Sequence, residues 1–245
     1  MIIAATCSPD TLLPSVACLI QRSLGMSGQP AFDINSACSG FVYGMGIADS
    51  MIRSGMAKHV LLVTTESMTS LIDYGDRATC VLFGDGAGAV VLGARGEGAM
   101  RAHRWGADGG EAELIFYGPK DDDPDGEDHL RMAGRGTFKL AVERLCTMAT
   151  AMCADAGWAV EDVQHFVPHQ ANQRIIEAAA KRLQVPMSRV ISTVDEMGNT
   201  SAASIPTALQ SGRAAGRFSP GDKVVCMAFG AGATWGGVAF EWTLP

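Results

Sequence analysis

Cys38 is the first residue whose type and place in the sequence could support catalysis. It lies in "INSACSGF", between small neighbours and directly before an apolar run with helical spacing. A thiol at the start of a helix faces unpaired backbone N–H groups, which favour the nucleophilic thiolate. The small neighbours leave room for a substrate, and the cysteine amide can face a developing oxyanion. A lone cysteine is more often a small buried hydrophobe, so position alone leaves both interpretations open.

His169 and Asn199 are the other candidates for chemistry. His169 ends the apolar run "HFVPH", and the ends of strands in open α/β sheets are where sites form. Asn199, in "EMGNTSAASIP", stands where a helix N-cap belongs. Taken singly, each also has a structural interpretation, as a histidine in a turn and as a capping residue. His165 is predicted to be structural, because Pro168 and the strand pattern exclude a helical metal-binding pair with His169.

Composition narrows the class of protein. The chain has 245 residues, 47% of them hydrophobic, with 29 glycines and a net charge of −7. The negative charge argues against a general nucleic-acid binder, and no run approaches the roughly 20 apolar residues of a membrane helix. The seven cysteines show no C-x-x-C spacing, so we predict neither a zinc site nor a disulfide framework, and a cytoplasmic location.

Strand-like and helix-like runs alternate along the chain, and this alternation predicts an α/β fold that would position these side chains. Several strands are apolar on both faces, so helices should cover each side of the sheet. The predicted strands are 1–6, 31–34, 59–66, 80–93, 165–169, 190–194, 223–229 and 235–242, with further extended segments from about residue 99. The predicted helices are 14–25, 39–55, 137–157, 172–184 and 201–216.

The sequence also repeats itself. A shift of 164 positions places "INSACSG" on "GNTSAAS", so that Asn35 meets Asn199 and Cys38 meets Ala202. Each segment leads to a helix, an apolar strand and a Phe-Gly loop, which predicts two copies of one α/β unit, residues 1–95 and 96–245. The second copy has extended segments and a long helix before its first matching strand. The first copy has no counterpart, so we expect about 70 residues to be absent from its front.

The motifs together resemble ketoacyl-ACP synthase III, the initiating condensing enzyme of type II fatty acid synthesis. The matching stretches are "ACSGF", "FGDGAGA", "MAGRGTFKLAV", "PHQANQRII", "GNTSAASIP" and "FGAGATWG". The resemblance implies a thiolase-like fold with two duplicated βαβ-rich halves, mixed sheets and layered helices, here with an N-terminally truncated first half. It also implies a homodimer.

The resemblance assigns the family's Cys–His–Asn set to Cys38, His169 and Asn199. It implies that Cys38 takes an acyl group from an acyl-CoA and that the other two stabilise the enolate formed from malonyl-ACP. The amides of Cys38 and Ala231 would form the oxyanion hole. The product would be a 3-oxoacyl-ACP, and neither a metal nor a redox cofactor is implied.

Further positions carry over from the family to binding roles. The resemblance places Arg77, Gly134, Phe138, Ala171 and Asn172 along the CoA and pantetheine path. Leu13 corresponds to a pocket-floor position that reaches the partner subunit, and it favours acetyl-CoA or another short primer. The positions matched to carrier binding are Arg174, Lys181 and Arg182.

Other functions compete with this one. A related enzyme could prime a polyketide or another specialised pathway. A truncated, non-catalytic thiolase-like subunit could pair with a full-length partner. A cysteine hydrolase with a Cys–His pair would leave both the internal repeat and "GNTSA" unexplained.

Overall fold

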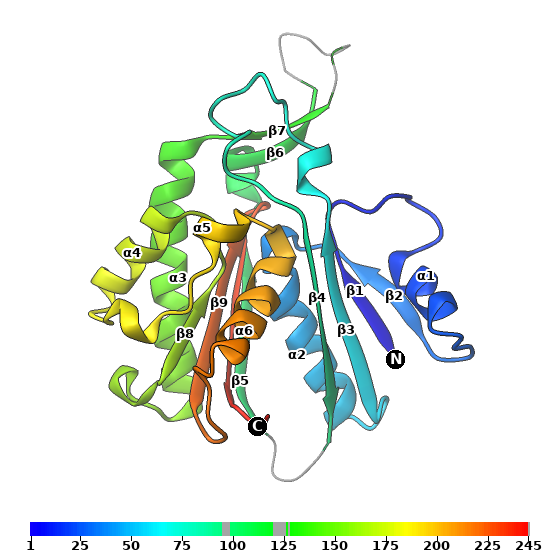
Figure 1. Cartoon of the computed structure of the whole chain (residues 1–245), viewed down its shortest axis with the longest axis vertical. Helices are drawn as coiled ribbons and strands as arrows, with labels where there is room; N and C mark the ends of the chain where they lie inside the picture. The colour runs from blue at the N-terminus through cyan, green and yellow to red at the C-terminus, as the bar shows by residue number, and fades with distance from the viewer. Residues whose placement is uncertain (95–98, 120–125, 127, 245) are drawn as a thin grey trace.

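Two four-stranded sheets stand side by side with helices between and around them (Figure 1). The computed structural model describes residues 1–94, 99–119, 126 and 128–244. The first sheet has the order β2-β1-β3-β4, and its strands are β1 Ile2–Ala5, β2 Ala31–Ile34, β3 His59–Glu66 and β4 Gly86–Gly93. The second has the order β5-β10-β9-β8, and its strands are β5 Met100–Ala107, β8 His165–Pro168, β9 Lys223–Gly230 and β10 Thr234–Glu241.

The two sheets share one pairing pattern. β1 runs parallel to β3 and β3 antiparallel to β4, just as β8 runs parallel to β9 and β9 antiparallel to β10. β9 lies at the same shift of 164 from β3 that relates Cys38 to Ala202. β5 adds an antiparallel strand to β10, whereas no described strand pairs with the outer edge of β4. The predicted boundary after residue 95 falls outside the described residues and stays a prediction.

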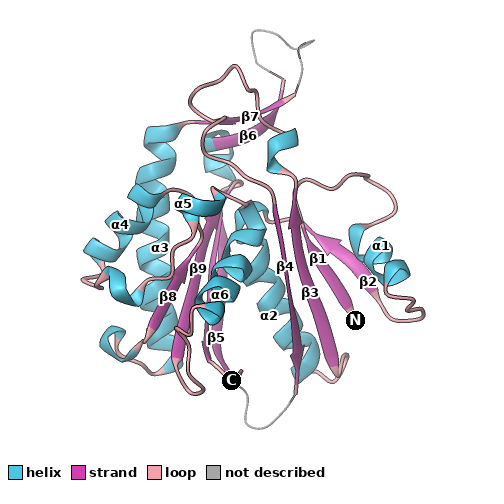
Figure 2. Cartoon of the chain, viewed as in Figure 1, coloured by secondary structure: helices cyan, strands magenta, loops and turns pink. Residues whose placement is uncertain are grey.

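Helices form layers around the sheets (Figure 2). α2 and α6 lie between the sheets: α2 contacts β3 and β10, and α6 contacts β4 and β8. α3 packs on β9 and β10 and against α4, while α1 covers β1 and β2. The bounds are α1 Val16–Ser23, α2 Gly40–Arg53, α3 Gly134–Ala156, α4 Gln173–Arg182, α5 Val194–Met197 and α6 Ser204–Ala214. None of the described helices is both long and apolar enough to cross a bilayer.

One hydrophobic core joins the two halves through the central layer. It contains Phe41 of α2, Leu62 of β3, Ile205 of α6 and Val238 of β10, all of them buried. A second core lies between the second sheet and the helices α3 and α4. A short hairpin of β6 Ile115–Gly118 and β7 His129–Met132 stands at one end of the molecule (Figure 1).

The structure corrects three predicted features. Residues 190–194 do not form a strand: Val190 makes one isolated bridge to Phe166, and the Gln170 side chain then accepts the backbone N–H of Thr193. The strand predicted from residue 80 begins only at Gly86. Helices do not cover both faces of the first sheet, since alternate residues of β4 are exposed and Val91 is 71% exposed.

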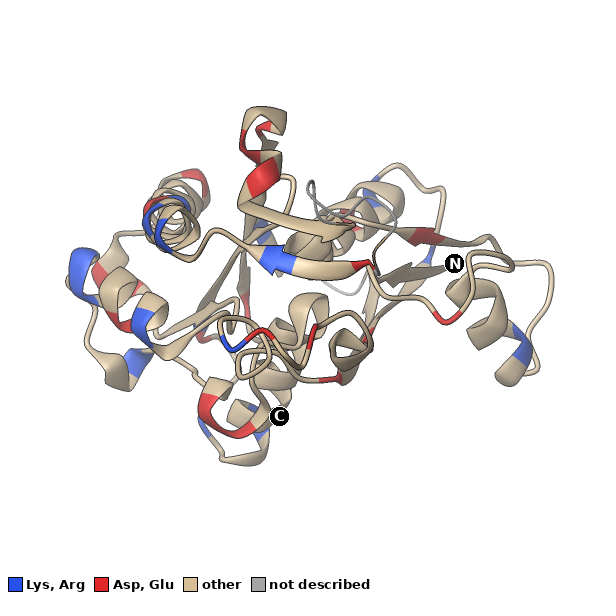
Figure 3. Ribbon diagram, turned by 90° about the horizontal axis from the view of Figure 1, so that it is seen from above, with Lys and Arg blue, Asp and Glu red and all other residues tan. Residues whose placement is uncertain are grey.

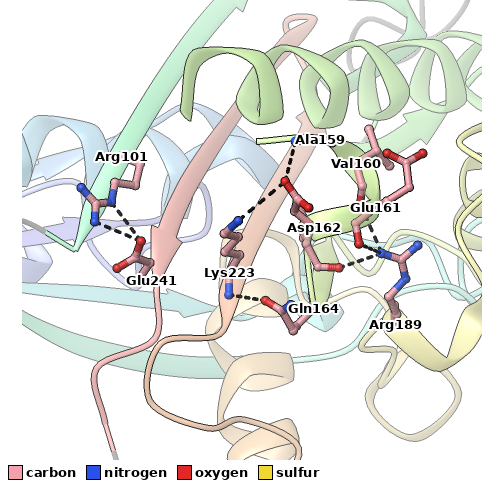
Figure 4. A network of polar contacts seen from close by, with 10 residues as sticks. Arg101, Ala159, Val160, Glu161, Asp162, Gln164, Arg189, Lys223 and Glu241 are labelled. Carbon is pink, nitrogen blue, oxygen red and sulfur yellow. Dashed lines mark hydrogen bonds and ion pairs between the residues drawn. The ribbon is translucent and has the colours of Figure 1, made fainter. Parts of the chain in front are cut away.

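Polar contacts surround the first residue of β9, Lys223, and the last residue of β10, Glu241 (Figure 4). Arg101 of β5 pairs with Glu241 of β10 at 3.0 Å, and Lys223 lies 3.7 Å from Asp162. Such exposed pairs contribute little to stability, on the order of 0–1 kcal/mol each. All four residues belong to the second half, so the contact between the two halves depends on the buried core instead.

The shared core gives the first prediction. Phe41→Ala should lower the free energy of unfolding by about 3–5 kcal/mol, because it opens a cavity between the two sheets. Urea unfolding followed by circular dichroism measures this change. Phe116→Ala, at a side chain that is 41% exposed, is the matched control and should cost less than about 1 kcal/mol. Equal losses in the two variants would contradict a core shared by both halves.

Candidate active site

Cys38, His169 and Asn199 line one cavity of about 510 Å³ between the two halves. Cys38 comes from the first half, and the other two come from the second. All three side chains are at most 9% exposed. Apolar residues make up much of the remaining wall, among them Met68, Leu71, Leu82, Phe83, Ile115, Leu130, Met132, Ala141, Ile175 and Phe229. A cavity with apolar walls and a few convergent polar groups suits an acyl chain attached to a polar reacting end.

Cys38 stands in a tight turn, Ala37–Ser39, that leads into α2; we call it the nucleophile turn. Ala37 has a φ of +47°, a left-handed conformation that is uncommon for a residue with a side chain. Its backbone N–H donates to Asn35 Oδ1 at 3.1 Å, which supports this conformation. Backbone strain of this kind persists only where the surroundings enforce it, and it is frequent at active sites.

β9 approaches the nucleophile turn so closely that only glycine fits at its last position. A Cβ on Gly230 would lie 2.8 Å from the Cys38 backbone nitrogen and 3.1 Å from that of Ser39. Ala231, the next residue, also lines the cavity. The backbone amides of Cys38 and Ala231 therefore belong to segments that meet beside the thiol, as an oxyanion hole requires.

Asn199 is oriented by its own backbone surroundings. Its Oδ1 accepts the backbone N–H of Ser201 at 2.9 Å, so its NH₂ group is left to donate into the cavity. Its backbone N–H donates to Leu82 O, and its carbonyl accepts from Gly84 N. The loop "FGDG" thus fixes the asparagine segment, and the Gly84 amide is used for this contact.

His169 is buried and has one ring nitrogen engaged. Its Nδ1 lies 2.7 Å from Ser204 Oγ, which leaves Nε2 for the cavity that the residue lines. Burial lowers the pKa of His169 to about 3, because the imidazolium would lose its hydration. The imidazole is therefore neutral near pH 7 and carries a single N–H.

The protonation of Cys38 differs from the sequence-based expectation. Burial raises the pKa of the Cys38 thiol to about 12; a hydrogen bond with Ser201 partly offsets this, and the charge of Glu66 raises it further. The start of a helix was expected to favour the thiolate. That expectation is wrong for this structure, because the turn is desolvated and burial outweighs the helix terminus.

Glu66 is a buried carboxylate behind the nucleophile turn that the sequence analysis missed. It accepts hydrogen bonds from Ser8 Oγ at 2.6 Å, from the Cys7 backbone at 3.1 Å and from the Ala202 backbone at 3.3 Å. The internal shift of 164 pairs Glu66 with Gly230. Glu66 therefore binds a backbone amide of the turn Ser201–Ala203, the companion turn. Gly230, at the corresponding position beside the Cys38 amide, has no side chain that could bind that amide.

The other predicted site residues fall into two groups. Those that line the cavity are Gly134, Phe138, Ala171, Asn172, Arg174 and Ala231. Those that lie outside it, all exposed, are Leu13, Arg77, Lys181 and Arg182. Leu13 is 83% exposed and does not form the floor of this chain's own cavity. Its role toward a second subunit and the CoA role of Arg77 stay predictions.

Two further residues of the site had no clear signal in the sequence. Cys7 lines the cavity, and its Sγ lies 3.5 Å from Ser201 Oγ. Ser204 contacts His169 across 35 positions of sequence. The internal repeat could have indicated Glu66 through its pairing with Gly230, but no local pattern indicates Ser204. Within the described part of the chain, no group of three His, Cys, Asp or Glu side chains could hold a metal ion.

Comparisons with known proteins find matches over most of the chain. Residues 32–109 match the family model of 3-oxoacyl-[acyl-carrier-protein (ACP)] synthase III, and residues 153–242 match the model of its C-terminal part. β-Ketoacyl-[acyl-carrier-protein] synthases III from Rhodobacter capsulatus and Cereibacter sphaeroides are 47% and 48% identical, over 98% of this chain and 76% of theirs. The synthase III structure from Thermus thermophilus, 41% identical, superposes with a TM-score of 0.93 over 98% of this chain and 76% of that one.

The close approach of β9 gives a prediction. Gly230→Ala should slow acylation of Cys38 by about 10²–10³-fold, because the new methyl group displaces the Cys38 amide. Intact-protein mass spectrometry after mixing with acetyl-CoA measures the rate. Gly109→Ala, where an added Cβ meets nothing within 4 Å, is the control and should keep the native rate. A native rate in a folded Gly230→Ala variant would exclude a role for this amide.

The raised pKa of Cys38 gives a second prediction. Alkylation of Cys38 by iodoacetamide should rise about tenfold per pH unit from about pH 7 to pH 9, because only the thiolate reacts. Peptide mapping separates Cys38 from Cys18, the exposed cysteine of α1 that serves as the internal control. A rate for Cys38 that levels off near neutral pH would show that the thiol is already ionised.

Proposed function

Because the chain belongs to the 3-oxoacyl-[acyl-carrier-protein] synthase III family, we propose that it condenses an acyl-CoA primer with malonyl-ACP to initiate fatty acid synthesis. The observation that carries the proposal is the meeting of Cys38, His169 and Asn199 in one cavity, with two N–H donors left for that cavity. The fold class is α/β and thiolase-like, as its solved relatives show.

The first step is acyl transfer to Cys38. The thiolate attacks the thioester carbon of the acyl-CoA, the amides of Cys38 and Ala231 stabilise the oxyanion, and CoA leaves as a thiol that takes up a proton. The result is an acyl-Cys38 intermediate. Since the thiol has a raised pKa, formation of the thiolate limits how much enzyme is ready to react at neutral pH.

The second step is decarboxylation followed by condensation. His169 Nε2–H and the Asn199 NH₂ group donate to the thioester oxygen of malonyl-ACP, so loss of CO₂ leaves a stabilised enolate. The enolate carbon attacks the acyl carbon on Cys38, the C–S bond breaks, and 3-oxoacyl-ACP is released. Thiol, imidazole and amide groups suffice for both steps as proposed.

The surface around the cavity supports an acidic carrier as the second substrate. Arg174 lines the cavity, and Lys181 and Arg182 lie exposed on the same helix, α4. Lys and Arg segments lie on the helices at the side away from the N-terminus, where Figure 1 places α3 and α4, interspersed with Asp and Glu segments (Figure 3). We also propose a homodimer, supported by Leu12 and Leu13, which are 89% and 83% exposed on one loop.

Intact-protein mass spectrometry tests acyl transfer. The native chain mixed with acetyl-CoA should gain one acetyl group, and Cys38→Ser should not form the thioester. Peptide mapping places the added mass, and longer and branched acyl-CoAs define the primer. A folded native chain that gains no acyl group from any of these thioesters would overturn the proposed function.

Substitutions of His169 and Asn199 should impair the second half-reaction and leave the first one intact. His169→Ala and Asn199→Ala should still form acyl-Cys38, but decarboxylation of malonyl-ACP should fall by about 10²–10⁴-fold, because the enolate loses a donor. Release of labelled CO₂ measures the second step. His59→Ala, at an exposed histidine of β3, is the control and should retain both activities. Equal loss of acylation and decarboxylation would contradict this division of roles.

A further inference from the structure

Ser204, the first residue of α6, makes a contact to His169 that the reaction as proposed above does not use. The side chain is 1% exposed, and its Oγ lies 2.7 Å from His169 Nδ1. The same Oγ accepts the backbone N–H of Gln170 at 3.3 Å. A buried serine hydroxyl is thus placed between the ring of His169 and the backbone of the next residue.

The hydrogen atoms of this contact can be counted. A backbone N–H can only donate, so Gln170 occupies one lone pair of the serine oxygen. The hydroxyl has one hydrogen of its own, and within the described residues no second acceptor is recorded for it. If His169 Nδ1 carried a proton, the serine oxygen would accept twice and its own hydrogen would stay unused in a buried site, which is unfavourable. The hydroxyl therefore donates to Nδ1.

We propose that Ser204 is a positioning residue that holds His169 in the tautomer protonated at Nε2, the nitrogen left for the cavity. A neutral imidazole has a single N–H, so only this tautomer can donate to the thioester oxygen of a bound malonyl group. The opposite tautomer would turn a lone pair toward the developing enolate. The consequence for turnover rests on the proposed function, whereas the tautomer itself does not.

The backbone around the histidine is held as firmly as the ring. The Gln170 side chain is 1% exposed; its Nε2 donates to the carbonyls of Pro168 and Ile191, and its Oε1 accepts from Thr193 N. The His169 backbone N–H donates to Met227 O of β9 at 2.8 Å. Because the backbone is fixed by these bonds, the Ser204 contact decides the orientation and tautomer of the ring rather than the path of the chain.

The tautomer is tested by long-range ¹H–¹⁵N NMR on the full chain labelled with ¹⁵N-histidine, with His169→Asn assigning the signals. The native chain should show Nε2 protonated and Nδ1 as an acceptor near neutral pH. Ser204→Ala should give a mixture of tautomers and lower kcat for condensation by about 10–100-fold, with little change in KM or in acylation of Cys38. Ser204→Cys, which keeps a weak donor, should restore part of kcat.

Thr207→Val is the matched control, because it removes a hydroxyl one turn further along α6 that donates only to backbone carbonyls. It should leave both the NMR signals and kcat unchanged. Protonation of Nδ1 in the native chain would overturn the proposal, and so would an unchanged tautomer in Ser204→Ala. If Ser204→Ala does not fold, the native spectrum and the Ser204→Cys variant still show whether Ser204 sets the tautomer of His169. The predicted tautomer in a chain that performs no condensation would leave this inference standing and overturn the proposed function instead.

Discussion

The site depends on the close approach of two turns, the nucleophile turn and the companion turn, where the two halves of the molecule meet. A Cβ on Gly40 would lie 3.0 Å from the Cβ atoms of both Ala5 and Ala202, and one on Gly230 would lie 2.8 Å from the Cys38 nitrogen. Such contacts leave no space for larger side chains. The small residues around Cys38 therefore serve packing as well as access, and they bring groups from residues 38, 169 and 199 into one cavity.

The two turns are equivalent by the internal repeat, yet only one carries a nucleophile. Ala37 and Ser201 occupy matching positions and have nearly the same left-handed φ, +47° and +49°. In the companion turn Ala202 replaces the cysteine, and its amide is bonded to Glu66. In the nucleophile turn Gly230 takes the place of that carboxylate. The internal repeat thus contains two similar turns: one carries Cys38, and the other orients Asn199 through the backbone amide of Ser201.

The sequence predicted most of the framework because hydrophobic periodicity and glycine stops are local signals. It placed β2 and β3 at their observed bounds and named Cys38, His169 and Asn199, which share the cavity. It failed at residues 190–194, where the Gln170 side chain takes a hydrogen bond that a strand would use. It missed Ser204 and Glu66, since contacts across 35 or 136 positions leave no local pattern. It also misjudged the Cys38 thiol, because burial depends on the whole fold.

The complete reaction shows whether these groups form one condensing site. Malonyl-ACP labelled with ¹³C in its free carboxyl group would be incubated with the native chain and a primer acyl-CoA, and the carrier and the gas would be analysed by mass. We expect one labelled CO₂ for each unlabelled 3-oxoacyl-ACP formed. CO₂ release without 3-oxoacyl-ACP, or an acylated enzyme that never consumes malonyl-ACP, would contradict it.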